Sequence, residues 1–115
     1  MNIEELDVFK LSHQLTKEIY QLTKNFPKDE LYGMVSQLRR ASLSIPGNLM
    51  EGNYRFSKNE YKHFISISRG SCAEVRYLLL LSFELNYINK ESFDELTLKC
   101  NRIISMLTKL YHSIN

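Results

Sequence analysis

The residues in this chain that are best suited to chemistry are basic, and they gather in its middle. Residues 31–80 contain seven Lys or Arg against three Glu, whereas residues 1–30 contain four against six. Lys62, Arg69 and Arg76 lie seven residues apart, a spacing that sets them along one side of a helix. Spaced positive charges suit a phosphate backbone, which proteins bind mainly through electrostatic contacts. The predicted nucleic-acid-binding residues are Arg39, Arg40, Arg55, Lys58, Lys62, Arg69 and Arg76.

The same basic residues have a plainer structural interpretation. Lys and Arg beside an apolar seam often cover it with their stems and pair with acids on a neighbouring helix. Glu74 is a suitable partner for Arg39 or Arg40. For any single arginine we favour this structural role, and for the group as a surface we favour nucleic acid. Four tyrosines interleave with the charges and could stack on bases or pack in the core, namely Tyr32, Tyr54, Tyr61 and Tyr77.

Metal binding and catalysis find little support in the sequence. Glu60 and His63 have the Glu-x-x-His spacing of di-iron bundles, but the chain has no second pair, and Glu60 also fits a capping box with Ser57. No serine lies in a G-x-S-x-G motif, and there is no glycine-rich phosphate loop. We therefore expect no enzyme activity, no metal and no cofactor. The alternative is a metalloenzyme that uses Glu60 and His63, which metal analysis would reveal.

The composition is typical of one soluble domain. The chain has 115 residues, 43% of them hydrophobic and 24% charged, and its net charge of +2 identifies no partner. Cys72 and Cys100 belong to no C-x-x-C motif, so we interpret them as buried thiols in a reducing compartment. The longest apolar run, residues 77–81, is far too short for a membrane span. We expect a cytoplasmic location and no contact with a membrane.

The elements that must position these residues are helices. Apolar residues recur at gaps of three and four in four stretches, which is the period of amphipathic helices. The predicted helices span residues 6–24, 30–52, 57–85 and 90–113. Their heptad seams and short connections predict an all-α, antiparallel up-down-up-down four-helix bundle that forms a single domain over residues 1–115.

A few residues mark the ends and irregularities of these helices. Gly52 is predicted to end the second helix, and Asn89 is predicted to cap the fourth. Pro46 lies inside the second helix, where it removes a backbone donor and crowds the carbonyl of Ser42, so we expect a kink there and not an end. Small residues around Pro46 and in residues 68–71 predict a close approach of the second and third helices.

Residues 75–83, VRYLLLLSF, are apolar on nearly every side of the third helix. A surface helix in a monomer of this size seldom needs so many apolar residues. Either this segment is enclosed in the core or it meets another subunit. The candidate residues for an oligomer interface are Tyr77, Leu78, Leu80, Leu81 and Phe83.

A series of short motifs runs through nearly the whole chain. They are Phe26-Pro27, Glu30-Leu31-Tyr32-Gly33, Gln37-Leu38-Arg39-Arg40-Ala41, Ser44-Ile45-Pro46, Asn48, Glu51-Gly52, Ser57, Glu60, Gly70-Ser71, Glu74 and Leu85-Asn86-Tyr87. On these residues the chain resembles the four-helix bundle family encoded within intervening sequences of bacterial 23S rRNA genes. That family also includes the accessory variability proteins of diversity-generating retroelements. Asn86 stands where the family usually has glycine.

The resemblance implies a bundle that assembles into a homopentamer with a basic central channel. It also implies nucleic-acid binding and, in the retroelement members, association with a reverse transcriptase. Arg39, Arg40 and Glu74 belong to the shared motifs, where they can hold the fold together without binding a ligand.

Two functions follow as hypotheses. The first is a non-enzymatic, oligomeric bundle that binds structured RNA or a DNA/RNA hybrid through a basic surface on the second and third helices. The alternative is a protein-interaction module, which would dock a partner such as a reverse transcriptase without touching nucleic acid.

Overall fold

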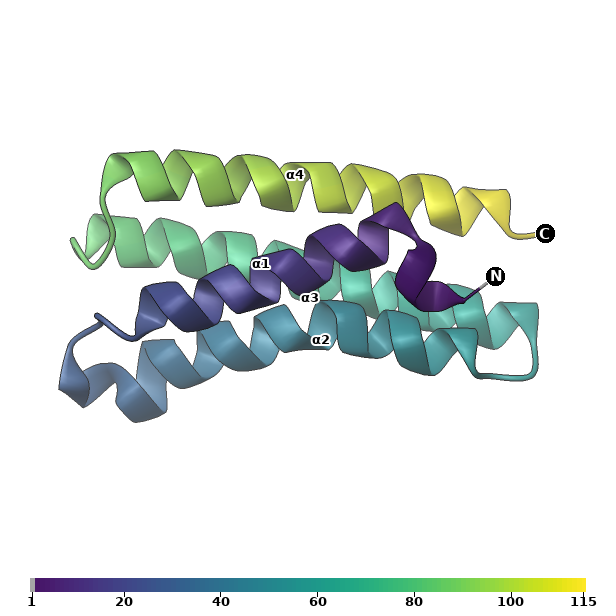
Figure 1. The fold of residues 1–115 in the computed structure, drawn as a ribbon, viewed down its shortest axis with the longest axis horizontal. Helices are drawn as coiled ribbons and strands as arrows, with labels where there is room; N and C mark the ends of the chain where they lie inside the picture. Colours follow the sequence, from purple (N-terminus) through teal and green to yellow (C-terminus); the bar gives the residue numbers. More distant parts are fainter. Residues whose placement is uncertain (1) are drawn as a thin grey trace.

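Four long helices run antiparallel in the computed structural model, which describes residues 2–115 (Figure 1). They are α1 (Asp7–Thr23), α2 (Ser36–Asn53), α3 (Lys58–Glu84) and α4 (Lys90–Ser113). Short helical turns precede α1 and α2, at Ile3–Glu5, Lys28–Glu30 and Leu31–Val35. No strand occurs within the described residues, and both ends of the chain lie at the same end of the bundle. The predicted all-α four-helix bundle is confirmed.

The heptad seams predicted from the sequence form the core. Burying a large aliphatic side chain contributes roughly 1.5–3 kcal/mol, so this cluster holds the four helices together. The outward faces of α3 and α4 remain available for polar and basic side chains. The fully buried residues include Leu15 and Ile19 from α1, Leu38, Ile45 and Leu49 from α2, Ile65, Val75 and Leu79 from α3, and Ile103 and Leu107 from α4.

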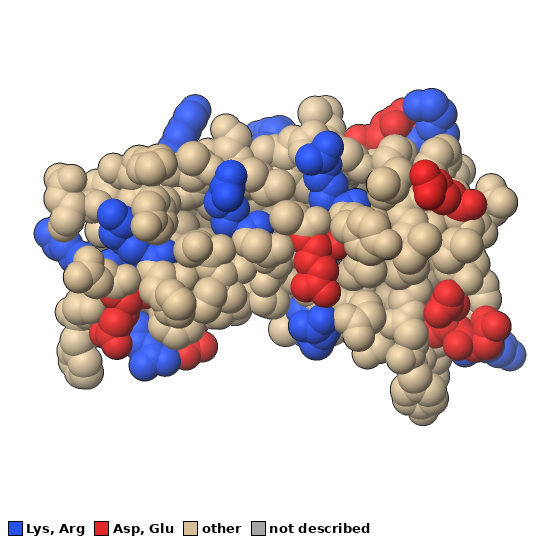
Figure 2. All heavy atoms as spheres, turned by 180° about the vertical axis from the view of Figure 1, so that it is seen from behind, with Lys and Arg blue, Asp and Glu red and all other residues tan. Residues whose placement is uncertain are grey.

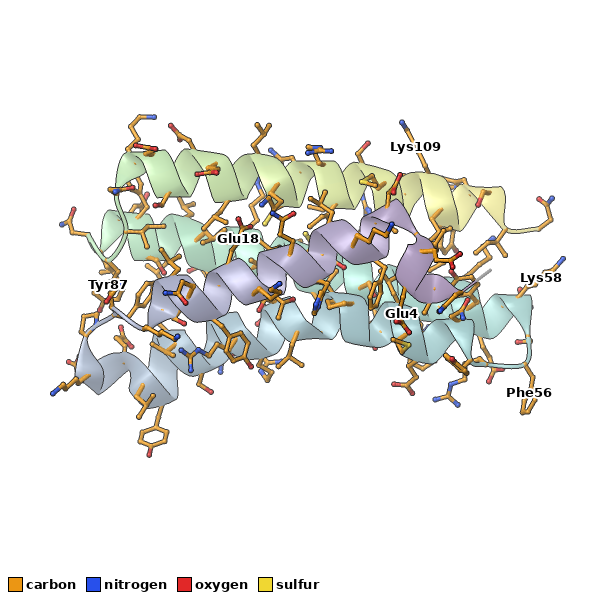
Figure 3. All side chains as sticks on the ribbon, viewed as in Figure 1. Glu4, Glu18, Phe56, Lys58, Tyr87 and Lys109 are labelled. Carbon is orange, nitrogen blue, oxygen red and sulfur yellow. The ribbon has the colours of Figure 1, made fainter. Side chains whose placement is uncertain are left out.

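The start of the second helix differs from the predicted continuous helix. Residues Leu31–Val35 form a π-helical turn in which Gly33 leaves helical geometry, with φ −114° and ψ −109°. Glu30 holds this turn, because one of its carboxylate oxygens accepts from the Met34 amide at 3.2 Å. The other oxygen accepts from the Tyr87 hydroxyl at 2.7 Å, so the α3–α4 connection fixes the turn (Figure 3). A distant contact of this kind leaves no local signal in the sequence.

The helix continues through Pro46, as predicted, and stays α-helical on both sides of it. Pro46 cannot donate to the Ser42 carbonyl four residues earlier. The Thr16 hydroxyl of α1 donates to that carbonyl instead, at 2.9 Å. The sequence predicts a kink at Pro46. The departure from helical geometry that the structure shows lies instead at Gly33.

The predicted close approach of α2 and α3 through small residues is confirmed. The hydroxyl oxygens of Ser44 and Ser71 lie 2.7 Å apart. Ser68 donates to the Ile45 carbonyl at 2.9 Å. Hydroxyl groups therefore tie the two helices together along their buried edge.

Gly52 does not end the second helix, because α2 extends one residue further. The residue is buried, and a Cβ at this position would lie 2.6 Å from the Cβ of Phe64. A helical residue with any side chain would therefore push α3 away. Gly52 serves the contact between α2 and α3.

The starts of α3 and α4 follow the predicted capping, whereas Leu6 precedes α1 without a side-chain cap. Ser57 and Glu60 form a complete capping box at the start of α3, and the Asn89 side chain accepts from the Ser92 amide at 2.8 Å at the start of α4. Asn86 has a φ of 64°, in the left-handed region that glycine and asparagine tolerate best. Asparagine thus serves the turn where the resembled family usually has glycine.

Candidate nucleic-acid interface

Two of the seven predicted basic residues have carboxylate partners. Arg40 pairs with Glu74 at 3.1 Å, and Arg55 pairs with Glu51 at 2.6 Å. Both pairs are exposed, so each contributes only about 0–1 kcal/mol to stability. The carboxylates nevertheless offset the positive charge that these arginines would offer to an anion.

Arg39 is held by α1. Its Nε donates to the Thr23 hydroxyl at 2.9 Å, and one Nη donates to the Tyr20 carbonyl at 3.3 Å. The guanidinium also lies over the Tyr20 ring, 4.7 Å from its centroid. Arg39 therefore joins α2 to α1. This contact fits the structural interpretation of the arginines that the sequence also allows.

The row on α3 keeps its charge. Within residues 2–115, Lys62, Arg69 and Arg76 have no carboxylate at ion-pair distance. Neutral groups contact the first two. The Lys62 ammonium lies 4.5 Å from the centroid of the Tyr111 ring, and the Arg69 Nε donates to the Thr108 hydroxyl at 3.0 Å.

Figure 2 shows basic side chains spaced along the length of one face of the molecule, with acidic side chains more frequent toward one end. Lys58 is exposed and begins α3 at the opposite end, where it projects from the bundle (Figure 3). The predicted row thus places separate positive charges at intervals along α3.

The second half of α4 adds cations that the sequence analysis did not assign to the surface. Residues 61–73 and 96–115, which lie against each other across α3 and α4, contain five Lys or Arg and no Asp or Glu. Arg102 and Lys109 are exposed, and Lys109 projects away from the bundle (Figure 3). Lys99 is different, because it pairs with a carboxylate of α1.

A charge count over the last 35 residues hides these cations. Residues 81–115 hold four basic and four acidic residues, so the block appears neutral. All four acids lie in residues 84–95, and only one Lys lies among them. A count over each half of the helix would have separated an acidic half from a basic one.

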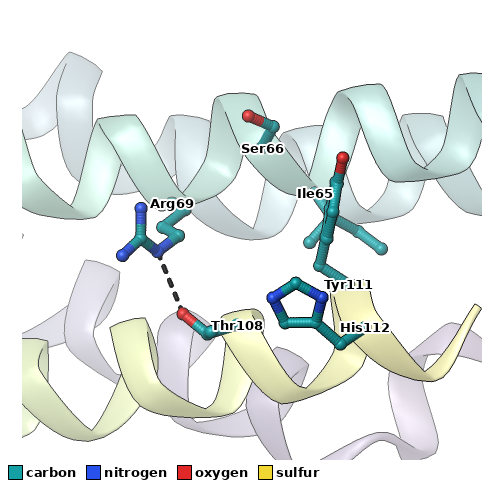
Figure 4. Close-up of a pocket in the computed structure, with 6 residues that line it drawn as sticks. All are labelled: Ile65, Ser66, Arg69, Thr108, Tyr111 and His112. Atoms are coloured by element: carbon teal, nitrogen blue, oxygen red, sulfur yellow. Dashed lines mark hydrogen bonds between the residues drawn. The ribbon is translucent and has the colours of Figure 1, made fainter.

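A pocket of about 290 Å³ opens between α3 and α4, with Arg69 in its lining (Figure 4). A second hollow, of about 260 Å³, adjoins Arg76 and lies between the same two helices. We call the two hollows together the α3/α4 groove. Its borders are Lys62, Arg69 and Arg76 on α3 and Thr97, Thr108 and His112 on α4. The lining residues of the first pocket are Ile65, Ser66, Arg69, Thr108, Tyr111 and His112.

The fold has a solved counterpart. A crystal structure of a protein of unknown function from the S23 ribosomal protein family, from Bacteroides thetaiotaomicron, matches with a TM-score of 0.81. The match covers 90% of this chain and 97% of that chain at 21% sequence identity, so it shows the fold alone. No curated protein matches the chain.

The family model described as 23S rRNA-intervening sequence protein matches residues 4–109. The chain belongs to the 23S rRNA-intervening sequence protein family. This membership confirms the resemblance to proteins encoded in rRNA intervening sequences.

The five predicted interface residues lie at different depths in the bundle. Tyr77 and Leu80 are 59% and 41% exposed. Leu78 is only 8% exposed and belongs to the core of its own bundle, so its assignment to a subunit interface is wrong. Leu81 and Phe83 are half-buried against the core, and Phe83 stacks on an aromatic ring of α4. Helix α3 packs against both α2 and α4, which widens its buried face.

The predicted tyrosines also divide by exposure. Tyr32, Tyr54 and Tyr77 are exposed, whereas Tyr61 is partly buried and burial raises its pKa. None of these four lines the pocket of Figure 4. The tyrosine that does is Tyr111 of α4, which the sequence analysis did not select.

Two further features of this 23S rRNA-intervening sequence protein have structural roles. Glu60 is the capping-box carboxylate, and within residues 2–115 no three His, Cys, Asp or Glu side chains gather as a metal-binding group. Cys72 and Cys100 are buried free thiols. Hydrogen bonding to Cys100, together with burial, raises the pKa of the Cys72 thiol, which keeps it protonated and unreactive.

Among the described residues, no helix combines the length and the apolar composition needed to cross a membrane.

Proposed function

We propose that this protein is a non-enzymatic nucleic-acid-binding bundle that works as a homo-oligomer, a homopentamer by resemblance. Its ligand is structured RNA or a DNA/RNA hybrid. The observation that supports this function is the row of Lys62, Arg69 and Arg76, which has no carboxylate partner among the described residues. The proposed surface is the α3/α4 groove and not the predicted face of α2 and α3, because the arginines of α2 are engaged within the fold.

The strength of such binding depends on salt. Each phosphate that the protein neutralises releases counterions, and it adds about 0.7–0.9 to the slope of log affinity against log salt concentration. A homo-oligomer repeats the groove, so one nucleic acid can engage several copies and gain affinity through avidity.

A filter-binding titration over a range of salt concentrations tests the proposal, with structured RNA, a DNA/RNA hybrid and duplex DNA as ligands. Arg69→Gln and Arg76→Gln should each lower the salt slope by about 0.7–0.9. Arg40→Gln and Arg55→Gln remove the same formal charge from ion-paired positions and should change the slope much less. No binding at low salt would refute the proposal, and equal effects of all four variants would refute the groove as its site.

Docking of a protein partner is a second candidate function. The exposed Tyr77 and Leu80 lie beside Arg76 and form an apolar border to the groove. If the chain is related to the retroelement accessory proteins, the partner would be a reverse transcriptase. A pull-down with and without nuclease distinguishes the two functions, because a protein partner stays bound after nuclease treatment and a nucleic-acid bridge does not.

A further inference from the structure

We propose that the pocket between α3 and α4 is a binding site for one nucleotide, whose phosphate is held by Arg69. The inference rests on the proposed function in that it uses the same groove, but it assigns a defined ligand to a defined cavity. The pocket would hold a single nucleotide unit, either free or at an unpaired position of a strand, and not a duplex.

The charge of the pocket selects an anion. Its lining contains Arg69 and His112 but no Asp or Glu, and the Lys62 ammonium lies over the neighbouring Tyr111 ring. The chain segments that form its walls, residues 61–73 and 96–115, contain no acid at all. An anion that enters the pocket therefore meets only positive or neutral groups.

Thr108 orients the guanidinium of Arg69 for this task. The Thr108 hydroxyl donates its only proton to the Ile104 carbonyl at 2.8 Å, so it can only accept from the Arg69 Nε, at 3.0 Å (Figure 4). Within residues 2–115 neither Nη atom of Arg69 has a hydrogen-bond partner. The guanidinium is thus held by its Nε edge, while its terminal N–H groups keep the fork geometry that suits a phosphate.

The rest of the pocket fits an organic body attached to that phosphate. Ile65 and Tyr111 supply apolar walls (Figure 4). The volume of about 290 Å³ lies just below the usual range for small-molecule sites, which is roughly 300–1,000 Å³. A cavity of this size between two helices accepts one nucleotide and excludes base-paired nucleic acid.

Isothermal titration of the full-length protein tests the assignment, with uridine monophosphate, uridine and inorganic phosphate as separate probes. Uridine monophosphate should bind more tightly than either of the other two. Arg69→Gln should weaken its binding by at least about tenfold, which is the lower limit for loss of a charged hydrogen-bond donor. Arg40→Gln removes an equal formal charge from an ion-paired position outside the pocket and should leave binding unchanged.

Thr108 provides a second, matched pair of variants. Thr108→Val keeps the shape but loses the hydroxyl that holds Arg69, so it should weaken uridine monophosphate binding. Thr108→Ser keeps the hydroxyl and should retain binding. Similar losses in both variants would overturn the orienting role that we assign to this hydroxyl.

Two outcomes would overturn the site itself. Equal affinity for uridine and its monophosphate would exclude a phosphate site, and equal affinity for phosphate and the monophosphate would exclude a nucleotide site. Failure of this inference differs from failure of the proposed function. If uridine monophosphate does not bind while long RNA does, and Arg69→Gln and Arg76→Gln weaken RNA binding equally, only the pocket assignment fails.

Discussion

Thr16 lies on α1 opposite the Ser42 carbonyl, which Pro46 leaves without its usual backbone donor. The single hydroxyl proton of Thr16 is shared between this carbonyl, at 2.9 Å, and the Ser12 carbonyl of its own helix, at 3.0 Å. A buried acceptor without a partner costs free energy, so one side chain on a neighbouring helix makes the proline tolerable. The sequence shows the proline but not its remedy, because Thr16 is 26 residues away from Ser42.

The Thr16→Val variant should lower the free energy of unfolding by about 1–3 kcal/mol, because it leaves the Ser42 carbonyl without a donor. Thr16→Ser keeps the hydroxyl and should lose much less. Urea denaturation followed by circular dichroism measures both. Equal losses in the two variants would show that the methyl group, and not the hydroxyl, matters at this position.

Two glycines of α2 should respond to alanine in opposite directions. Gly52→Ala should destabilise the protein by about 1–3 kcal/mol, because the added Cβ meets Phe64 at 2.6 Å. Gly47→Ala has open space around its Cβ and should stabilise the helix by about 0.5–1 kcal/mol. Thermal unfolding of the two variants beside the wild type checks the prediction, which fails if both shift the midpoint in the same direction.

At the level of whole elements, the sequence predicted what local chemistry determines. Helix periods follow from apolar spacing, and the capping residues Ser57 and Asn89 act within their own first turns. The π-helical turn at Gly33 was missed, because it depends on Glu30 and its bond to Tyr87, 57 residues away. Contacts that fix a backbone from a distance cannot be inferred from the segment that they fix.

The bond between Glu30 and Tyr87 predicts a dependence of stability on pH. It lowers the pKa of the Glu30 carboxyl from its ordinary 4.5 and raises that of the Tyr87 hydroxyl above its ordinary 10.0. The lowered carboxyl pKa adds stability that is fully present above pH 4.5. This stability is lost as the pH falls through the lowered pKa of the folded protein. The raised hydroxyl pKa adds stability that is fully present below pH 10.0. This stability is lost as the pH rises through the raised pKa of the folded protein.

The free energy of unfolding of the wild type should therefore exceed that of Tyr87→Phe. The difference should be largest between pH 4.5 and pH 10.0. The difference should shrink in acid and in strong base, because each change of protonation weakens the bond that only the wild type can form. Urea unfolding of both proteins at a series of pH values measures it. A difference that does not vary with pH would contradict the assignment.

At the scale of the whole molecule, the bundle measures 44 × 24 × 20 Å, and the α3/α4 groove follows helices that run along its long axis. Half of this candidate site was predictable, since the heptad spacing of Lys62, Arg69 and Arg76 is visible in the sequence. The other half was not, because Thr108 and Tyr111 reach the row only through the register of α4 on α3.

Self-association is the prediction that belongs to this scale. Light scattering at micromolar concentration should give the wild type a mass several times 13.6 kDa. Leu80→Glu should lower that mass toward a single chain, because it puts a charge into the exposed apolar part of α3. Leu98→Glu serves as the control, since Leu98 is 63% exposed on α4 outside the predicted interface. A wild-type mass near 13.6 kDa would rule out the oligomer.

The uneven charge of α4 gives the groove a direction. A strand of nucleic acid that follows the row from Lys62 to Arg76 approaches the acids of residues 84–95 at the far end of the bundle, where like charge repels it. Under the proposed function, the covered stretch would therefore stop short of the turn at Asn86. In a closed ring of identical copies every groove has the same sense, so such an assembly would have an attracting rim and a repelling rim.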